Sequence, residues 1–431
     1  MTRTILRGRV FTFIGEPQDI DDTASYRYLE DGAVTIENGK IIAVGVYSPA
    51  DAAGAEVIDH RPSLIMPGLI DLHLHYVQMQ VIGSYAPALL DWLHAYTFVE
   101  EQKFGQQGHA AAIATSFFDE LIRNGTTTAV AYCSVHPESV DAFFTEAARR
   151  NMLMVGGKVM MDRNAPEALL DTAQSGYDDT KALIARWQGK GRAHYAISPR
   201  FAITSTPAQL EASRALVAEF PECYVQTHLS ENDAEIAYSM ELYPEAKDYL
   251  GIYEDYGLLG RKTLLGHSIH LSHREAHVTA ETGSVAVFCP TSNLFLGSGL
   301  FDYERLHKTG VRIGIATDIG GGTSVSMLRT LDEGFKVAQL RKQQLSPLNS
   351  FYLATLGNAR ALGLEDRIGS IAPGRDADLV VLDSSAISHM ALRMQTISGV
   401  AQELFLLQTM GDDRSVREVY IAGEAAKTRL A

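Results

Sequence analysis

The stretch LIMPGLIDLHLH, residues 64–75, is a short apolar run that ends in two histidines. A run of this length that is apolar at nearly every position is typical of a β-strand buried on both faces. Successive side chains of a strand point to opposite faces, so His73 and His75 point the same way. Two imidazoles held together at a strand end favour a metal site. The competing interpretation is two polar residues that leave a core strand for solvent.

Seven more runs of this kind follow along the chain, and helical patterns separate most of them. The segment 108–125, for example, reads as a helix that stops at Asn124-Gly125. Eight strands that alternate with helices predict an α/β fold of the TIM type, a (β/α)8 barrel. The further predicted strands are residues 126–136, 153–162, 193–201, 223–232, 263–272, 284–293 and 311–322.

Both ends of the chain carry short β-type runs instead of this alternation. Near the N-terminus they are residues 4–13 and 32–45, and the second run turns at Asn38-Gly39, a strong hairpin signal. Near the C-terminus they are residues 369–383 and 416–426. Neither end is long enough to bury a core alone, and chain termini often lie close together. We therefore expect residues 1–65 and 375–431 to form one small β-sandwich domain, with the barrel at 66–374.

Composition narrows the class of protein. The chain has 431 residues, 46% of them hydrophobic, and a formal net charge of −15. It has no basic run that would match a phosphate backbone, so we expect a small-molecule partner and no nucleic acid. The three cysteines are far apart and form no CxxC pair, which argues against disulfides and thiolate zinc. No uninterrupted apolar run could span a bilayer, and we expect a cytoplasmic protein without a membrane partner.

Polar residues mark the ends of three other predicted strands. His228 ends the fifth strand and is followed by Ser230 and Glu231, His267 ends the sixth, and Asp318 ends the eighth. In a (β/α)8 barrel these ends meet at one rim, where the active site forms. Any one of these residues alone is more often an ordinary turn or core residue. Together with the two histidines of the first strand they predict a metal site with nitrogen and oxygen ligands and an open position for water.

The same residues carry a resemblance to the amidohydrolase superfamily, through PGLIDLHLH at 67–75 and the separated His228, His267 and Asp318. Further stretches resemble the guanine deaminases within it, and they cover about residues 66–335. Val77 departs from the pattern, because the bacterial enzymes often have proline there. The stretches are residues 75–104 (HYVQMQVIGSYAPALLDWLHAYTFVEEQKF), 157–164 (GKVMMDRN), 198–206 (SPRFAITST), 227–236 (THLSENDAEI), 289–301 (CPTSNLFLGSGLF) and 316–333 (ATDIGGGTSVSMLRTLDE).

The resemblance implies one zinc ion per chain and the hydrolysis of guanine to xanthine and ammonia. It implies that Glu231 transfers protons, that His267 orients the water, and that Asp318 accepts the water proton as well as binding metal. It also implies a homodimer. The implied metal ligands are His73, His75, His228 and Asp318, and the implied purine pocket is Gln78, Trp92, Leu93, Arg200 and Phe201.

Residue chemistry supports the purine pocket but leaves alternatives open. Arg200 offers a rigid fork of donors to the oxo group of a purine, and the amide of Gln78 offers both donors and an acceptor. Trp92, Leu93 and Phe201 offer a flat apolar surface, although ordinary core packing would explain each of them singly. The nearest alternative substrates are 8-oxoguanine, a pterin or a triazine. A barrel without catalytic activity is the alternative of another class.

Lys158 bears on how many metal ions are bound. Two-metal members of the superfamily use a carboxylated lysine on the fourth strand, whereas Lys158 falls on the third predicted strand and the fourth contains no lysine. We therefore expect a mononuclear site and a structural role for Lys158. His94, His136 and His270 could lie near the rim, and the sequence assigns them no role. The H-x-E…P-C-x-x-C signature of cytidine-type deaminases does not occur in the sequence.

Overall fold

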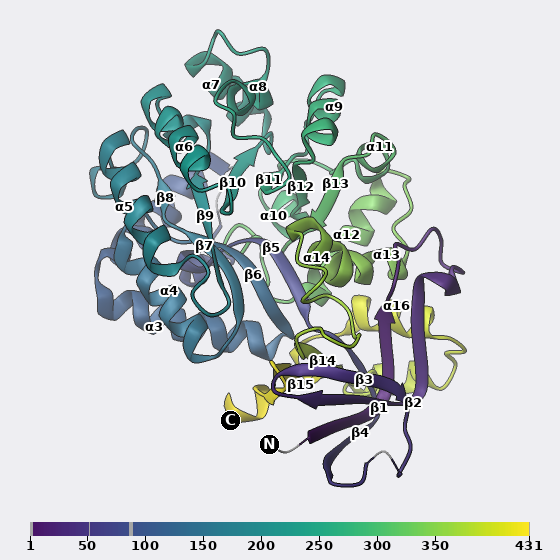
Figure 1. The fold of residues 1–431 in the computed structure, drawn as a ribbon. Helices are drawn as coiled ribbons and strands as arrows, with labels where there is room; N and C mark the ends of the chain where they lie inside the picture. The colour runs from purple at the N-terminus through teal and green to yellow at the C-terminus, as the bar shows by residue number, and fades with distance from the viewer. Residues whose placement is uncertain (1–2, 51, 86–88, 431) are drawn as a thin grey trace.

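A computed structural model describes residues 3–50, 52–85 and 89–430. Its centre is a near-closed barrel of eight parallel strands in sequence order, which confirms the predicted fold class (Figure 1). A short extra strand, β8 (Val159–Met160), extends the third strand and pairs with the fourth. The barrel strands are β5 (Leu69–His75), β6 (Thr126–Tyr132), β7 (Leu153–Gly157), β9 (Ala193–Pro199), β10 (Tyr224–Leu229), β11 (Thr263–His267), β12 (Val285–Phe288) and β13 (Arg312–Ile315).

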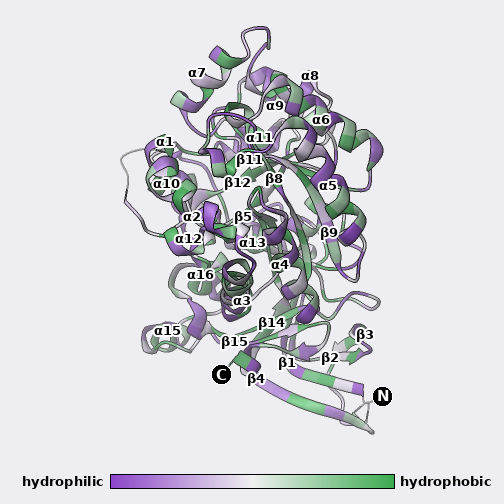
Figure 2. Ribbon diagram, turned by 90° about the vertical axis from the view of Figure 1, so that its left-hand side faces the viewer, coloured by the Kyte–Doolittle hydropathy of each residue, from purple (hydrophilic) through white to green (hydrophobic). Residues whose placement is uncertain are grey.

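Helices surround the barrel on the outside (Figure 1). Those that connect successive strands are α3 (Gln107–Arg123), α4 (Pro137–Arg149), α5 (Ala173–Trp187), α6 (Pro207–Glu219), α7 (Asp233–Leu242), α8 (Tyr249–Asp255), α9 (His273–Thr282), α10 (Pro290–Phe295) and α11 (Tyr303–Lys308). After the last barrel strand come α12 (Met327–Leu340), α13 (Pro347–Tyr352), α14 (Asn358–Leu362), α15 (Ser388–Met394) and α16 (Val400–Met410). In Figure 2 hydrophobic residues line the barrel strands, whereas hydrophilic residues gather on the outer turns of the helices.

The chain ends supply a second sheet, as expected. This mixed sheet has seven strands in the order β16-β15-β14-β4-β1-β2-β3, so strands from both termini lie side by side. The hairpin at Asn38-Gly39 is confirmed, because both residues have positive φ and the flanking Glu37 and Lys40 are paired. The domain boundaries themselves stay a prediction. The strands are β1 (Arg3–Phe13), β2 (Tyr26–Glu37), β3 (Lys40–Val46), β4 (Ala55–Pro67), β14 (Leu379–Leu382), β15 (Val416–Ile421) and β16 (Glu424–Ala425).

The run 64–75, predicted as one strand, is divided at Gly68. Residues up to Pro67 belong to β4 in the terminal sheet, and β5 enters the barrel from Leu69. A Cβ at Gly68 would lie 2.2 Å from the hydroxyl oxygen of Thr127, so no larger residue fits where the chain passes from one sheet to the other. All seven residues of β5 are buried, as a barrel strand covered on both faces requires.

The barrel closes between its first and last strands through the side chain of Asn358, which begins α14. Its amide nitrogen donates to the carbonyl oxygens of Ile70, at 2.7 Å, and Ile315, at 2.9 Å. Its amide oxygen accepts from the backbone nitrogen of Ile315 at 3.1 Å. Nearer the rim, the backbone nitrogen of Asp318 donates to the carbonyl oxygen of His73 at 2.9 Å. Asn358 thus takes the place of strand-to-strand hydrogen bonds in this part of the barrel.

Replacing Asn358 by leucine should therefore lower the free energy of unfolding by about 3 kcal/mol or more. The change keeps the size of the side chain but leaves three buried backbone groups without partners, and each such group costs about 1–3 kcal/mol. Thermal melting at one fixed scan rate measures the loss. Asn349→Leu is the matched control, because Asn349 is only partly buried and bonds the carbonyl oxygen of Pro17. Equal melting temperatures for the two variants would contradict this account of the barrel.

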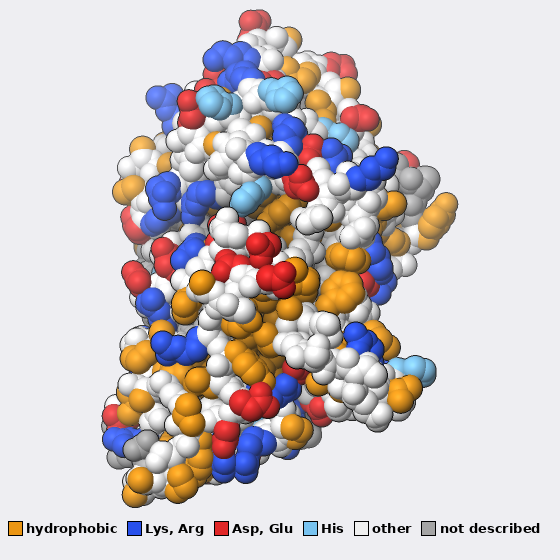
Figure 3. Space-filling view, turned by 90° about the vertical axis from the view of Figure 1, so that its right-hand side faces the viewer, with side chains coloured by type: hydrophobic (Ala, Val, Ile, Leu, Met, Phe, Trp, Pro, Cys, Tyr) orange, Lys and Arg blue, Asp and Glu red, His pale blue; other side chains and the backbone are white. Residues whose placement is uncertain are grey.

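Charged residues join the two parts of the chain and are mixed on the surface. The guanidinium of Arg192, just before β9, forms ion pairs with Asp376 and Asp378, just before β14. On the face drawn in Figure 3, acidic and basic side chains are interspersed, and apolar side chains gather in a central hollow.

Within the described residues, no helix has both the length and the apolar composition needed to cross a membrane.

Candidate active site

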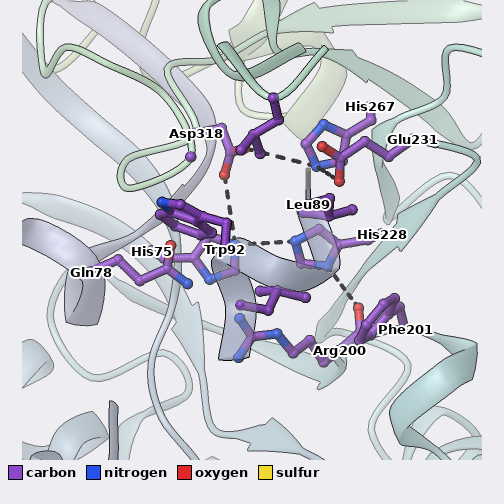
Figure 4. A pocket seen from close by; sticks show the side chains of 13 residues that line it. His75, Gln78, Leu89, Trp92, Arg200, Phe201, His228, Glu231, His267 and Asp318 are labelled. Carbon is purple, nitrogen blue, oxygen red and sulfur yellow. Dashed lines mark hydrogen bonds and ion pairs between the residues drawn. The ribbon is translucent and has the colours of Figure 1, made fainter. Parts of the chain in front are cut away.

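Four histidines and an aspartate converge at the carboxyl ends of the barrel strands, as predicted: His73, His75, His228, His267 and Asp318. Figure 4 shows all of them except His73. The Nε2 atoms of His75 and His228 lie 3.1 Å apart, which brings β5 and β10 together. The Oδ1 atom of Asp318 lies 3.4 Å from His73 Nε2 and 3.7 Å from His75 Nε2. His267 Nε2 is 3.9 Å from the other carboxylate oxygen of Asp318. All five residues are buried.

The backbone is strained where these strands end. Ser230, His267, Ser268 and Asp318 all have φ between 50° and 68°, the left-handed region that residues other than glycine rarely adopt. Two of these residues, His267 and Asp318, carry their side chains into the donor cluster and line the pocket beside it. Close packing adds a further requirement, because a Cβ at Gly266 would lie 2.5 Å from the ring of His73.

The donor atoms fit a bound cation. His228 Nδ1 donates to the carbonyl oxygen of Arg200 at 2.7 Å, so the lone pair of its Nε2 faces the Nε2 of His75. His73 Nε2 is buried without a hydrogen-bond partner among the described residues. Burial lowers the pKa of His75 and of His228 well below the ordinary value, which keeps both rings in the neutral form that binds metals. Neutral imidazole nitrogens and a carboxylate within reach of one another form a donor set that suits a bound metal ion.

Two aspartates, Asp318 and Asp71, contribute carboxylates in and below this cluster. Burial alone would raise the pKa of Asp318, but the nearby rings of His73 and His267 outweigh burial and lower it. Asp71 lies one level deeper in the barrel, where it accepts from the backbone nitrogens of His73, at 3.2 Å, and Thr317, at 3.1 Å. Asp71 therefore ties the first strand to the segment that carries Asp318.

Glu231 lies beside the donor cluster and is buried. Its Oε2 is 3.3 Å from His267 Nε2, and its Oε1 accepts from the hydroxyl of Ser298 at 3.0 Å. Its backbone nitrogen donates to Glu235 at 2.8 Å, which holds the loop after β10 in place. Burial raises the pKa of Glu231 to about 7, so this carboxyl group can both take up and release a proton near neutral pH. The other ring nitrogen of His267 bonds the side-chain oxygen of Asn293 at 3.0 Å.

A pocket opens next to the cluster, and it contains every residue predicted to bind a purine. Trp92 ends α1 (Leu89–Trp92), and Leu93 begins η3 (Leu93–Thr97), a π-helical turn of a kind often found at functional sites. Phe201 precedes η6 (Ala202–Thr204). The predicted residues are Gln78, Trp92, Leu93, Arg200 and Phe201, and the pocket is also lined by Leu89, Leu296 and Gly321, which the sequence did not indicate.

The two polar residues of the pocket share one buried carboxylate. Gln78 lies on η2 (Tyr76–Val81), and its Nε2 donates to Oε1 of Glu101 at 2.8 Å. Arg200 Nη1 donates to Oε2 of the same glutamate at 2.7 Å. Glu101 ends α2 (Phe98–Glu101) and is fully buried. Gly320 leaves room for this arrangement, since a Cβ there would lie 2.5 Å from the Cβ of Gln78. Sequence reasoning missed Glu101, because no spacing rule links it to either partner.

The remaining residues named from the sequence lie outside the donor cluster. Lys158 is buried between β7 and β8, where its Nζ pairs with Asp171 at 2.5 Å. His270 bonds the carbonyl oxygen of Ser298 at 2.8 Å, His94 packs against Phe98, and His136 precedes α4. Tyr132 was not predicted, yet its ring stacks on His75 with centroids 4.6 Å apart.

Comparison with known proteins identifies the family. The model of the amidohydrolase family matches residues 64–426 of this chain. A guanine deaminase of Escherichia coli (strain K12) is 44% identical over 419 residues, which make up 96% of this chain and 95% of that protein. The solved structure of E. coli guanine deaminase is 42% identical, with a TM-score of 0.95 over 98% of this chain and 99% of that one.

Two more distant solved structures show the same fold with bound molecules. A guanine deaminase from C. acetobutylicum with guanine in its active site is 28% identical, with a TM-score of 0.90 over 98% of this chain and all of that one (100%). An adenosine deaminase from Xanthomonas campestris with bound zinc is 26% identical, with a TM-score of 0.82 over 98% and 92% of the two chains. The family model matches most of this chain, and the E. coli enzyme is 44% identical over 96% of it. This chain therefore belongs to the amidohydrolase family and, within it, to the guanine deaminases.

Proposed function

We propose that this chain deaminates guanine to xanthine and ammonia, with one zinc ion per chain. The observation that carries the proposal is the buried set of three histidines and Asp318 beside a pocket that is lined by Gln78 and Arg200. In the reaction the bond from the ring carbon to the amino nitrogen breaks. A bond from that carbon to the oxygen of water forms. Ammonia leaves with the two amino hydrogens and one hydrogen from water, and the other hydrogen of water stays on the ring of xanthine.

The metal would be held by His73, His75, His228 and Asp318. Nitrogen and oxygen donors without a thiolate suit zinc, and the zinc bound in the related adenosine deaminase supports this choice. Zinc at this site would act as a Lewis acid that lowers the pKa of water from 15.7 toward about 7. Lys158 supports a single ion, because its amino group is paired with Asp171 and buried away from the cluster.

Glu231 and His267 act on the protons in this proposal. Glu231 Oε2 takes one proton from the attacking water and delivers it to the ring nitrogen. It then takes the second proton from the new hydroxyl group and delivers it to the departing amine. His267 Nε2, 3.3 Å from that oxygen, orients the water, and Asp318 accepts a hydrogen bond from it. The hydroxyl of Ser298 holds the other oxygen of Glu231, so the carboxyl group stays directed at the reacting atoms.

The pocket walls bind the base. Trp92, Leu93 and Phe201 exclude water and cover the faces of a flat ring, while Gln78 and Arg200 meet its polar edge. The alternatives are related aminohydrolases that act on 8-oxoguanine, a pterin or a triazine, because these rings also carry an amino group on an amidine-like carbon. Guanine is favoured because the E. coli relative named for it is 44% identical over almost the whole chain. A homodimer and a cytoplasmic location stay predictions.

Ammonia release from guanine by the purified protein tests this function. We expect turnover that a chelator abolishes and zinc restores, with about one zinc ion per chain in the active protein by elemental analysis. A protein that binds zinc but leaves guanine unchanged would reject guanine as the substrate. Two metal ions per chain in fully active protein would reject the mononuclear site.

A further inference from the structure

We propose that Glu101 sets the direction of the hydrogen bonds that the pocket offers to its substrate. Through Gln78 and Arg200 it selects a ring edge with an N–H donor beside a carbonyl acceptor. Glu101 is a positioning residue in this account, since it touches two pocket residues and not the reacting atoms. The inference rests on the proposed deamination of an aminopurine at this site.

The first step is the orientation of the Gln78 amide. A carboxylate only accepts hydrogen bonds, so the group of Gln78 that faces Glu101 must be its nitrogen. The 2.8 Å contact from Gln78 Nε2 to Glu101 Oε1 has this arrangement. Because the amide oxygen and nitrogen are otherwise interchangeable, the carboxylate decides which of them is free for another partner. A glutamine at position 101 could not impose that direction.

The second step is what remains available to a ligand. Within residues 3–50, 52–85 and 89–430, no group donates to Gln78 Oε1, and the guanidinium of Arg200 has one side-chain partner, Glu101. Both side chains line the pocket. The ring of Phe98, whose centroid is 5.5 Å from the guanidinium carbon, further restrains Arg200. In Figure 4 Gln78 and Arg200 lie on the side of the pocket away from His267 and Glu231. The pocket therefore presents an acceptor and donors side by side.

The third step is the chemistry of the ring. Guanine carries N1–H next to the C6 carbonyl, and N1 adjoins the carbon that bears the amino group. An acceptor from Gln78 and donors from Arg200 match this edge. Adenine presents the opposite order, an unprotonated N1 next to an amino donor. A site built for one order leaves buried groups unpaired with the other.

Glu101→Gln reverses the direction without changing the size of the side chain. The oxygen of the new amide can still accept from Arg200, and its nitrogen then donates to Gln78 Oε1. Gln78 in turn presents its NH2 group to the ring. The probe for this change is 2-aminopurine, which carries its amino group on the same carbon as guanine but has an unprotonated N1 and no carbonyl.

We expect Glu101→Gln to raise KM for guanine by about 10- to 100-fold, the usual cost of a buried hydrogen-bond donor left without a partner. The inhibition constant of 2-aminopurine should stay the same or fall. Metal content and kcat should change much less than KM. Glu100→Gln is the matched control: Glu100 pairs with Lys103 at 2.6 Å and does not line the pocket, so this variant should keep the guanine preference.

Three results separate the possibilities. If the variant bound guanine and 2-aminopurine more weakly by the same factor, Glu101 would only neutralise Arg200 and the proposal would be wrong. An unchanged KM for guanine would also overturn the proposal. If Glu101→Gln does not fold, Gln78→Met tests the same hydrogen bond with Glu101 intact. The loss of the acceptor oxygen of Gln78 should weaken the binding of guanine and leave the binding of 2-aminopurine unchanged. Wild-type protein that does not deaminate guanine would instead reject the proposed function.

Discussion

Glu231→Gln should lower kcat for guanine by about 10²- to 10⁴-fold, the usual contribution of one general acid–base group, or by more if the residue serves several steps. The substitution keeps the size of the side chain and removes only the group that titrates. Metal content should stay near that of the wild type, because Glu231 contacts His267 and Ser298 and is not one of the proposed metal ligands.

Steady-state kinetics and elemental analysis on the same preparation distinguish the roles open to Glu231. Glu241→Gln is the matched control and should match the wild type, because Glu241 is exposed near the end of α7, the helix that follows Glu231. Near-normal turnover by Glu231→Gln would remove Glu231 from the mechanism. Loss of the metal would make Glu231 a ligand instead.

Much of the site was predictable because strand geometry is periodic. His73 and His75 share a face in any β-strand, and parallel barrel strands end at one rim whatever the helices between them are. His228, His267 and Asp318 therefore had to lie near the first two histidines once eight strands had been counted. The structure brings them within hydrogen-bonding or ion-pairing range.

Residues that act through other residues were not predictable in this way. Glu101 contacts partners 23 and 99 positions away, and Ser298 reaches Glu231 across 67 positions. Each is an ordinary polar residue in the sequence, and only the three-dimensional packing gives it a role. The division of the run 64–75 at Gly68 was not predicted either, since apolar residues stand on both sides of that glycine.

The wild-type enzyme should prefer guanine to adenine by about 10⁴–10⁵ in kcat/KM, as do other sites that hydrogen-bond a substrate group which the analogue lacks. Arg200 is central to this preference. It is buried, and its planar guanidinium can bond Glu101 and a ring oxygen at the same time. Lysine has one nitrogen in place of that fork, so Arg200→Lys should lose most of the activity although the charge is kept.

The assay compares kcat/KM for guanine, adenine, cytosine, 8-oxoguanine and a pterin in the wild type and in Arg200→Lys. Arg214→Lys is the matched control, because Arg214 is exposed on α6 and far from the pocket lining. Adenine turnover close to that of guanine would contradict the donor and acceptor order assigned to the pocket. A higher kcat/KM with 8-oxoguanine or the pterin would make that compound the preferred substrate of the same deamination reaction. An unaffected Arg200→Lys would show that a point charge suffices, and the fork geometry that Glu101 holds in place would then have no part in selecting the base.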